Sequence, residues 1–456
     1  MASSLGSKSA RAADNDSDTE KHQQSPSSQG QDSDWCGIES LPTELLLKIT
    51  EHIAEDIDDL RSCCLVSHRW LECARPLLYH TANISEEKHL LRWHNLIKSC
   101  PVIGMQYLRT VQFTPWMPDD WPKSFPDLGP LPKVTRLDWT SNLGHHVQVD
   151  NQLRGFLNSL SSVTELSLSG AFRNSGELAV MLASFPRLTS LRIDSLVYRE
   201  RDIYDDVNYM GPGLEKLEIM YPHFHGYDDI VQWLMRGRES LHTRKLTVRM
   251  DALWDSTIQK LIDSSADSLE SLSLIPKDEQ AELNKTYISE PLPRLRHIEF
   301  KTFESFREAG VWTSLHFIMQ FIDHMPIAPT VTTMQLGFYV ANEDSLDTLF
   351  EDMDWEEIVQ EHLDRSFPGI RRVIVEIETD MDCGDEEFRE GYEQYVGDRL
   401  LLLGKETKVV WNDASARRLR ASKGKAKVDS GRLEKFRKLW EAFVAADGGE
   451  TFLSDG

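Results

Sequence analysis

Apolar residues recur along most of the chain at positions i, i+3 and i+5, and this spacing predicts a series of short strands. The well-formed copies are Leu108, Val111, Phe113; Val134, Leu137, Trp139; Val163, Leu166, Leu168; Leu188, Leu191, Ile193; Leu214, Leu217, Ile219; Thr243, Leu246, Val248; Leu269, Leu272, Leu274; and Leu295, Ile298, Phe300. Their first positions lie 25 to 29 residues apart, and looser copies start at Val331 and Ile370. A period of this size indicates stacked strand-containing units.

Segments with helical apolar spacing lie between several of these strands, at residues 176–185, 229–235, 256–262 and 315–322. Alternating strands and helices predict an α/β fold, a solenoid with a curved parallel sheet on its concave face. No unit can bury its apolar strand face alone, so neighbouring units must stack. Residues 399–411 predict a last strand pair that closes the solenoid. The alternative is an ordinary α/β domain in which the spacing is coincidental.

Three short helices are predicted in the segment before the repeats. Pro42 is placed to begin the first helix, residues 56–59 can cap a second helix at 60–66, and Ser67 is placed to cap the third, which should end or kink at Pro76. Leu45, Leu46, Ile49 and Ile53 fall within one face of the first helix, and Leu47 lies opposite. Helices this short leave apolar surface that a partner would cover.

The same segment carries a family resemblance. The residues are Leu41-Pro42, Glu44-Leu45-Leu46, Ile49, Leu60, Val66-Ser67 and Arg69-Trp70. Their order and spacing resemble the F-box, the three-helix module that docks substrate receptors onto the Skp adaptor of SCF-type cullin–RING ubiquitin ligases. The resemblance implies that the adaptor-binding residues are Leu41, Pro42, Ile49, Leu60, Val66 and Trp70. The alternative is a small helical subdomain packed on its own chain, with Trp70 in its core.

The repeats resemble those of F-box proteins with leucine-rich repeats, which are common in fungi. The asparagine that many such repeats place after the strand is mostly missing, so these repeats are degenerate. Together the two resemblances imply the substrate-recognition subunit of an SCF-type ubiquitin ligase, which needs no cofactor and is not an enzyme. Its partners would be a Skp-type adaptor and an unknown substrate protein. The alternative is a leucine-rich-repeat interaction scaffold that is not linked to ubiquitination.

We expect five regions along the chain. They are a disordered tail at 1–34, an F-box at 38–84, a linker helix at 85–105, a leucine-rich-repeat-like solenoid at 106–411 with looser repeats after 300, and a basic helical tail at 412–456.

Strand residues at i+2, i+4 and i+6 should point away from the core and line the concave sheet. In the middle repeats they include our candidate substrate-binding residues, which are Arg192, Asp194, Lys216, Glu218, Lys245 and Arg249. The four basic members suit an acidic or phosphorylated peptide. The alternative is that they pair with Asp194 and Glu218 and only keep the sheet soluble.

Composition narrows the function classes. The chain has 456 residues and a net charge of −24, which argues against nucleic acid or an anionic membrane as the main partner. Its six cysteines show neither zinc-site spacing nor a secreted disulfide framework, so we expect no metal site and a reducing compartment, cytoplasm and/or nucleus. No run of 18 apolar residues occurs, which predicts a soluble protein. No motif supplies residues for catalysis or cofactor binding.

Overall fold

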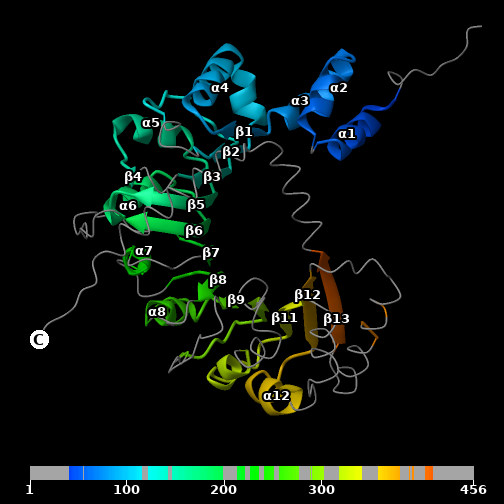
Figure 1. Cartoon of the computed structure of the whole chain (residues 1–456), viewed down its shortest axis with the longest axis vertical. Coiled ribbons are helices and arrows are strands. Elements are labelled where there is room, and N and C mark those ends of the chain that lie inside the picture. The colour runs from blue at the N-terminus through cyan, green and yellow to red at the C-terminus, as the bar shows by residue number, and fades with distance from the viewer. Residues whose placement is uncertain are drawn as a thin grey trace, which may run out of the picture.

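The structure is a computed structural model of the whole chain, in which the strands form one long parallel sheet (Figure 1). It describes residues 41–54, 56–115, 122–141, 146–198, 213–220, 226–235, 241–250, 256–276, 288, 290–301, 318–340, 358–379, 390, 393–394 and 406–413. The predicted tail at 1–34, residues 399–405 of the predicted last strand pair, and residues 414–456 lie outside this part.

Three helices form at the N-terminal end of the described chain, namely α1 Thr43–His52, α2 Ile57–Cys64 and α3 His68–Leu78. The Asp56 carboxylate caps α2, because it accepts hydrogen bonds from the N–H groups of Asp58 and Asp59 at 2.8 and 3.1 Å. Ser67 occupies the N-cap of α3 without a capping hydrogen bond from its side chain. The helix does not end at Pro76, since α3 continues through it to Leu78, and a kink at Pro76 stays a prediction.

The next elements connect these helices to the repeats. They are β1 Thr81–Ile84, α4 Glu87–Ser99 and the π-helix η2 Ile103–Tyr107. The linker helix predicted at 85–105 corresponds to α4. Strand β1 was not predicted, although Tyr79, Ala82 and Ile84 have the i, i+3, i+5 spacing 29 residues before Leu108.

The sheet has 13 strands, and every pairing is parallel. After β1 the strands are β2 Thr110–Phe113, β3 Arg136–Thr140, β5 Glu165–Phe172, β6 Ser190–Tyr198, β7 Lys216–Ile219, β8 Lys245–Met250, β9 Ser271–Pro276, β10 His297–Lys301, β11 Thr333–Val340, β12 Arg372–Thr379 and β13 Glu406–Asp413. The two-residue strand β4 His146–Val147 pairs beside β5. All ten predicted repeat strands are therefore confirmed, and β13 extends the sheet.

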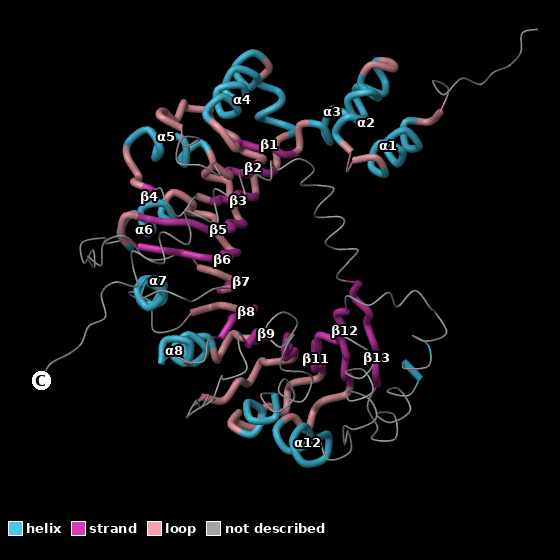
Figure 2. Tube along the Cα trace, in the orientation of Figure 1, coloured by secondary structure: helices cyan, strands magenta, loops and turns pink. Residues whose placement is uncertain are grey.

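Helices cover the outer side of the sheet, which curves into an open arc with the strands inside (Figure 2). They are α5 Asn151–Ser159, α6 Ser175–Ala183, α7 Gly226–Met235, α8 Ser256–Ser265, the helical residues 318–323, η5 Ile358–Leu363 and α12 Asp364–Ser366. Helices α6, α7 and α8 match three of the predicted segments, whereas α5 was not predicted. This arrangement is the expected α/β solenoid with N-terminal helices.

The core lies between the sheet and these helices. The residues at i, i+3 and i+5 of the ten repeats are all buried, and they belong to one continuous apolar cluster apart from Thr243. The strand register stacks equivalent residues, so that Leu191 lies beside Leu217 and Leu217 beside Leu246. Phe113 and Trp139 stack in the same way, with ring centroids 4.2 Å apart. The repeat spacing thus encodes the core.

A backbone ladder joins each repeat to the next one just before the strands. The Arg109 carbonyl accepts hydrogen bonds from the N–H groups of Thr135 and Arg136, and the Thr135 carbonyl accepts from Thr164 and Glu165. The same two-bond pattern continues from repeat to repeat as far as Arg371 and Arg372. It satisfies backbone groups at the strand entrances and holds neighbouring repeats together.

Candidate functional site

The N-terminal helices pack around a small core of their own. Leu46, Trp70 and Cys73 are buried together, and Leu41 and Cys63 pack against them. Arg69 of α3 reinforces this packing, since its Nη2 donates to the Leu41 carbonyl at 2.8 Å and to the Thr43 hydroxyl at 3.3 Å. Three helices that would be unstable alone thereby obtain a fixed arrangement.

Cysteines of these helices are free thiols, and burial is the largest cause that raises the pKa of each of Cys63, Cys64 and Cys73. A raised pKa keeps the thiols protonated at neutral pH and therefore poorly nucleophilic. Cys63 and Cys64 are helix residues in this structure.

Apolar side chains also gather on the outside of these helices. We call this set the apolar helix surface, and it consists of Leu45, Leu47, Ile49, Ile57, Leu65 and Val66. The described part of the chain exposes ten large apolar residues. Six of them belong to this surface, although α1–α3 form a small fraction of the described residues. Leu65 is the extreme case at 88% exposed. Such clustering marks a surface that a partner covers.

The six predicted adaptor-binding residues divide between the inside and the outside of this subdomain. Pro42, Ile49 and Val66 are exposed, whereas Leu60 and Trp70 are buried within the chain and Leu41 packs against the internal cluster. The exposed three are therefore accessible on the surface, and the other three contribute to packing within the subdomain. Contact of all six with an adaptor stays a prediction.

Four members of the apolar helix surface, Leu45, Leu47, Ile57 and Leu65, were not among the predicted site residues. For the first helix, the sequence did contain a signal that apolar residues would be exposed. Leu47 lies opposite the apolar face, and an amphipathic helix buries only one face, so one of the two sets must lie on the surface. The observed buried positions are Leu46 and Thr50, so most of the expected apolar face is the exposed one.

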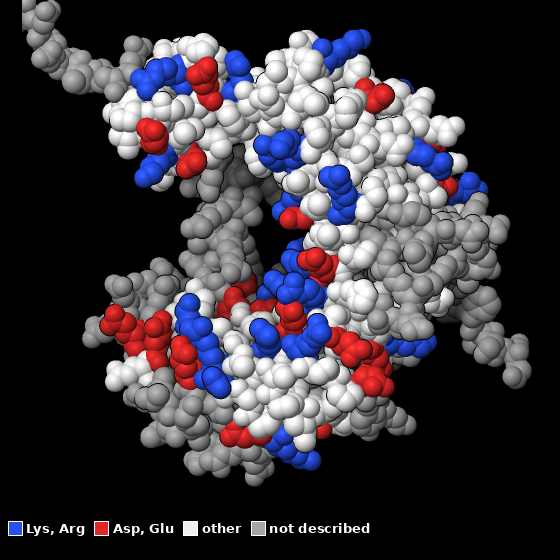
Figure 3. Space-filling model, turned by 180° about the vertical axis from the view of Figure 1, so that it is seen from behind, with Lys and Arg blue, Asp and Glu red and all other residues white. Residues whose placement is uncertain are grey.

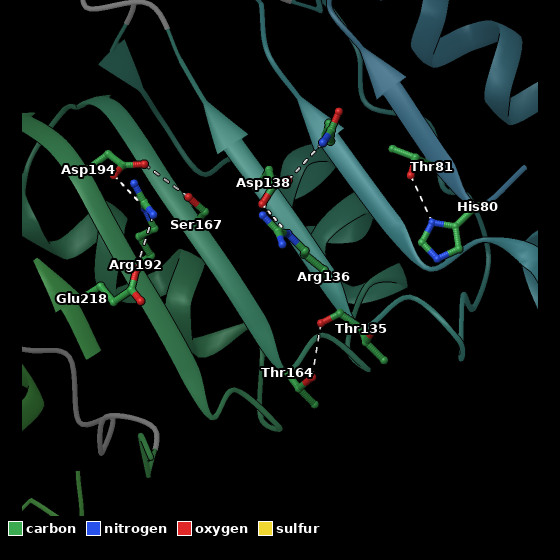
Figure 4. Close-up of polar contacts among 11 residues, drawn as sticks. His80, Thr81, Thr135, Arg136, Asp138, Thr164, Ser167, Arg192, Asp194 and Glu218 are labelled. Carbon is green, nitrogen blue, oxygen red and sulfur yellow. Dashed lines mark hydrogen bonds and ion pairs between the residues drawn. The ribbon is translucent and has the colours of Figure 1, made fainter. Parts of the chain in front are cut away.

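The concave face carries the second predicted set, and four of its members form one ion-pair network, of which Figure 4 shows Arg192, Asp194 and Glu218. Arg192 Nε donates to Asp194 Oδ1 at 2.8 Å, and its Nη1 lies 3.5 Å from Glu218 Oε2. Lys216 Nζ lies 2.6 Å from Glu218 Oε1. The pairing alternative therefore holds for Arg192 and Lys216, whose charges are already matched by carboxylates.

Asp194 occupies an irregular position in the sheet. Between β5 and β6 the register shifts after Leu168, so that Ser169 lies opposite Ser195 and Asp194 is the extra residue of a β-bulge. From this position its carboxylate also accepts a hydrogen bond from the Ser167 hydroxyl at 3.5 Å.

Lys245 and Arg249 lie outside this network, on the neighbouring strand β8. Lys245 is exposed and stands beside Lys216 in the strand register. Arg249 is half-buried and lies opposite Ile275. The four basic residues are therefore spread over three strands with interposed carboxylates, and they do not converge on one anion position.

The same arrangement recurs along the concave face. Arg136 pairs with Asp138 at 2.9 Å, Lys301 pairs with Glu299 at 3.1 Å, and Gln335 donates to Glu376 at 2.6 Å. Figure 3 shows positive and negative side chains interspersed on the hollowed side of the arc. His297, on the same face, has a lowered pKa chiefly because of burial. The face is a polar surface of mixed charge that can exchange internal pairs for bonds to a partner.

Comparison with known families identifies one part of the chain. Residues 38–85 match the family model described as F-box-like, which covers helices α1–α3 and strand β1. The chain therefore contains an F-box-like domain, the class of module that binds an adaptor. No curated protein matches the chain.

The described residues include neither a membrane-spanning helix nor a metal-binding cluster. None of their helices has both the length and the apolar character needed to span a membrane. None of their histidine, cysteine and acidic side chains form a group of three or more that could hold a metal ion.

Proposed function

We propose that this protein is the substrate-recognition subunit of an SCF-type cullin–RING ubiquitin ligase. The F-box-like domain would dock on a Skp-type adaptor, and the repeat solenoid would bind the substrate protein. Catalysis would be supplied by the assembly, because holding a substrate near a ubiquitin-charged enzyme raises its effective concentration. In this role the chain needs no catalytic residues or cofactor of its own and acts in the cytoplasm and/or nucleus.

The observation that carries the proposal is the apolar helix surface on the F-box-like domain. An isolated subdomain that served only as a cap of the solenoid would turn its apolar residues toward the repeats. Here Leu47, Leu65 and Val66 face outward instead, while the solenoid has a continuous core of its own. A protein partner that covers this surface would remove apolar area from water and gain affinity from it.

The proposed substrate surface is the concave face of residues 106–411, including Arg192, Asp194, Lys216, Glu218, Lys245 and Arg249. Support comes from its curvature and from its row of polar side chains. The network of Arg192 with its two carboxylates favours a substrate of mixed charge over a phosphopeptide, since an incoming phosphate would have to displace both carboxylates.

The test is assembly of purified full-length protein with a purified Skp-type adaptor, followed by size-exclusion chromatography with light scattering. We expect a stable one-to-one complex that recruits a cullin–RING pair. Failure of the folded protein to bind the adaptor would reject the receptor function and would leave the alternative, a leucine-rich-repeat scaffold not linked to ubiquitination.

A further inference from the structure

Strand β1 presents an unpaired edge. It is the first strand of the sheet and pairs only with β2 within the described part of the chain. The carbonyls of His80 and Ile84 accept hydrogen bonds from Thr110 and Thr114 of the β2 segment. Alternate residues of a parallel strand bond to opposite sides, so the N–H and C=O groups of Thr81 and Asn83 point away from β2.

A cavity of about 550 Å³ runs along this edge, between α2 and α3 on one side and α4 on the other. Thr81 and Asn83 form its floor, and Trp93 and Leu96 of α4 form an apolar wall. Tyr79 and Trp93 meet edge to face at 6.4 Å and 87°, which fixes the wall. The cavity therefore combines open backbone hydrogen-bonding groups with an apolar surface for side chains.

The ionisable side chains that line the cavity include two arginines and a histidine. Among the described residues its lining includes Arg61, His89 and Arg92 and no carboxylate, in a chain whose net charge is −24. Arg61 makes an exposed ion pair with Asp58 at 2.8 Å, and His89 Nδ1 lies 3.1 Å from the Ser85 hydroxyl. Arg92 is exposed and has no ion-pair partner among the described residues. An acidic occupant would complement this lining.

We propose that the cavity binds an extended acidic peptide, which adds to the sheet as a strand along β1. Its backbone would bond to Thr81 and Asn83, alternate apolar side chains would lie against Trp93 and Leu96, and its carboxylates would meet Arg61 and Arg92. This site shares Ile57 with the apolar helix surface but otherwise has a lining of its own, and it lies apart from the concave row of middle strands, so it adds a second binding activity to the proposed receptor.

The probe is a fluorescent, end-capped heptapeptide of alternating valine and glutamate, titrated with the full-length protein by fluorescence polarisation. The matched control peptide carries lysine in place of glutamate, and we expect it to bind at least roughly tenfold more weakly. N-methylation of one alternate set of peptide nitrogens should abolish binding, whereas methylation of the other set should leave it unchanged. That difference arises only when one edge of the peptide faces β1.

Two protein variants locate the site, each with a control. Arg92→Glu should weaken probe binding roughly five- to tenfold, while Lys98→Glu, an exposed residue on the same helix outside the cavity, should stay within about twofold. Asn83→Pro removes an N–H that faces the cavity without removing a bond to β2, so probe binding should be lost while the circular dichroism spectrum persists.

Several results would overturn the assignment. They are equal affinity for the glutamate and lysine peptides, equal loss from both methylation patterns, or unchanged binding by Arg92→Glu and Asn83→Pro. A wild-type dimer that dissociates in Asn83→Pro would identify a second copy as the occupant instead. Should Asn83→Pro unfold, the methylated peptides on the wild-type protein decide the question. Adaptor binding by the wild-type protein is measured separately, so failure here leaves the receptor function untouched.

Discussion

Replacing Leu65 and Val66 together by alanine should separate adaptor binding from folding. These residues form the turn between α2 and α3, where Leu65 is 88% exposed and Val66 53% exposed. Truncating side chains that make so little contact with their own chain should change the free energy of unfolding by less than about 0.5 kcal/mol. The variant Leu41→Ala would be less informative, because Leu41 packs on the internal cluster of Leu46 and Trp70.

The expected loss of affinity follows from the area that the adaptor would cover. Burial of each methylene-sized group contributes about 0.8 kcal/mol. Leu65→Ala removes three such groups that are almost fully exposed in the free protein, and Val66→Ala removes two that are half exposed. If the adaptor buries all of them, the pair contributes about 3 kcal/mol, and the dissociation constant should rise roughly a hundredfold.

The assay is isothermal titration of the purified variant with a Skp-type adaptor, together with thermal unfolding followed by circular dichroism. The matched control is Leu91→Ala, an apolar residue of α4 that is 41% exposed but lies outside α1–α3. It should bind the adaptor as the wild type does. Wild-type affinity of the Leu65→Ala, Val66→Ala protein would refute the docking role of this surface.

Three other predictions test the fold. Leu217→Asp places a charge in the fully buried row of Leu191 and Leu246 and should unfold several repeats. Circular dichroism should show the loss of helix and strand signal, and a folded variant would contradict the strand register. Gly170→Ala should lower the stability by at least roughly 1–3 kcal/mol in urea unfolding, because Gly170 has φ +144° and an added Cβ would lie 1.8 Å from the Ser141 hydroxyl oxygen. Burial lowers the pKa of His297 in the folded state. The free energy of unfolding should therefore be highest above the unfolded-state pKa of about 6.5 and should fall as the pH drops toward the folded-state pKa. His297→Gln should remove this dependence of the free energy of unfolding on pH, and an unchanged dependence in the variant would contradict the prediction.

The repeat strands were predictable because one simple requirement produces them. Each strand needs apolar residues on its helix-facing side, and even Thr243 in a first position is tolerated as a buried residue. Strand β1 has the same spacing, but its middle residue is Ala82, which gives a weak apolar signal. Helix α5 was missed although Asp150 caps it, with its carboxylate accepting from Leu153 N–H at 2.8 Å. Local signals were thus present in both cases.

The functional surfaces were less predictable, because packing between elements decides which side of a helix is exposed. Trp70 and Leu65 are both large apolar residues of the predicted F-box, yet Trp70 is 4% exposed and Leu65 is 88% exposed. The spacing of apolar residues is compatible with either outcome for each residue. Only the crossing of α3 over α1, held in part by Arg69 and the Leu41 carbonyl, determines that Trp70 faces inward.

The same reasoning explains why a basic site was expected on the concave face and an ion-pair network is found. Strict alternation places Arg192 and Asp194 side by side on one face, but it says nothing of whether they bond to each other. In the structure Arg192 pairs with Asp194 of its own strand, as Arg136 pairs with Asp138, and Glu218 of the next strand completes the network. A partner of this face must therefore replace bonds that already exist, which lowers the net gain from each charged contact. Selectivity would then come from matching many alternating charges over several repeats, and the affinity should fall steeply with added salt.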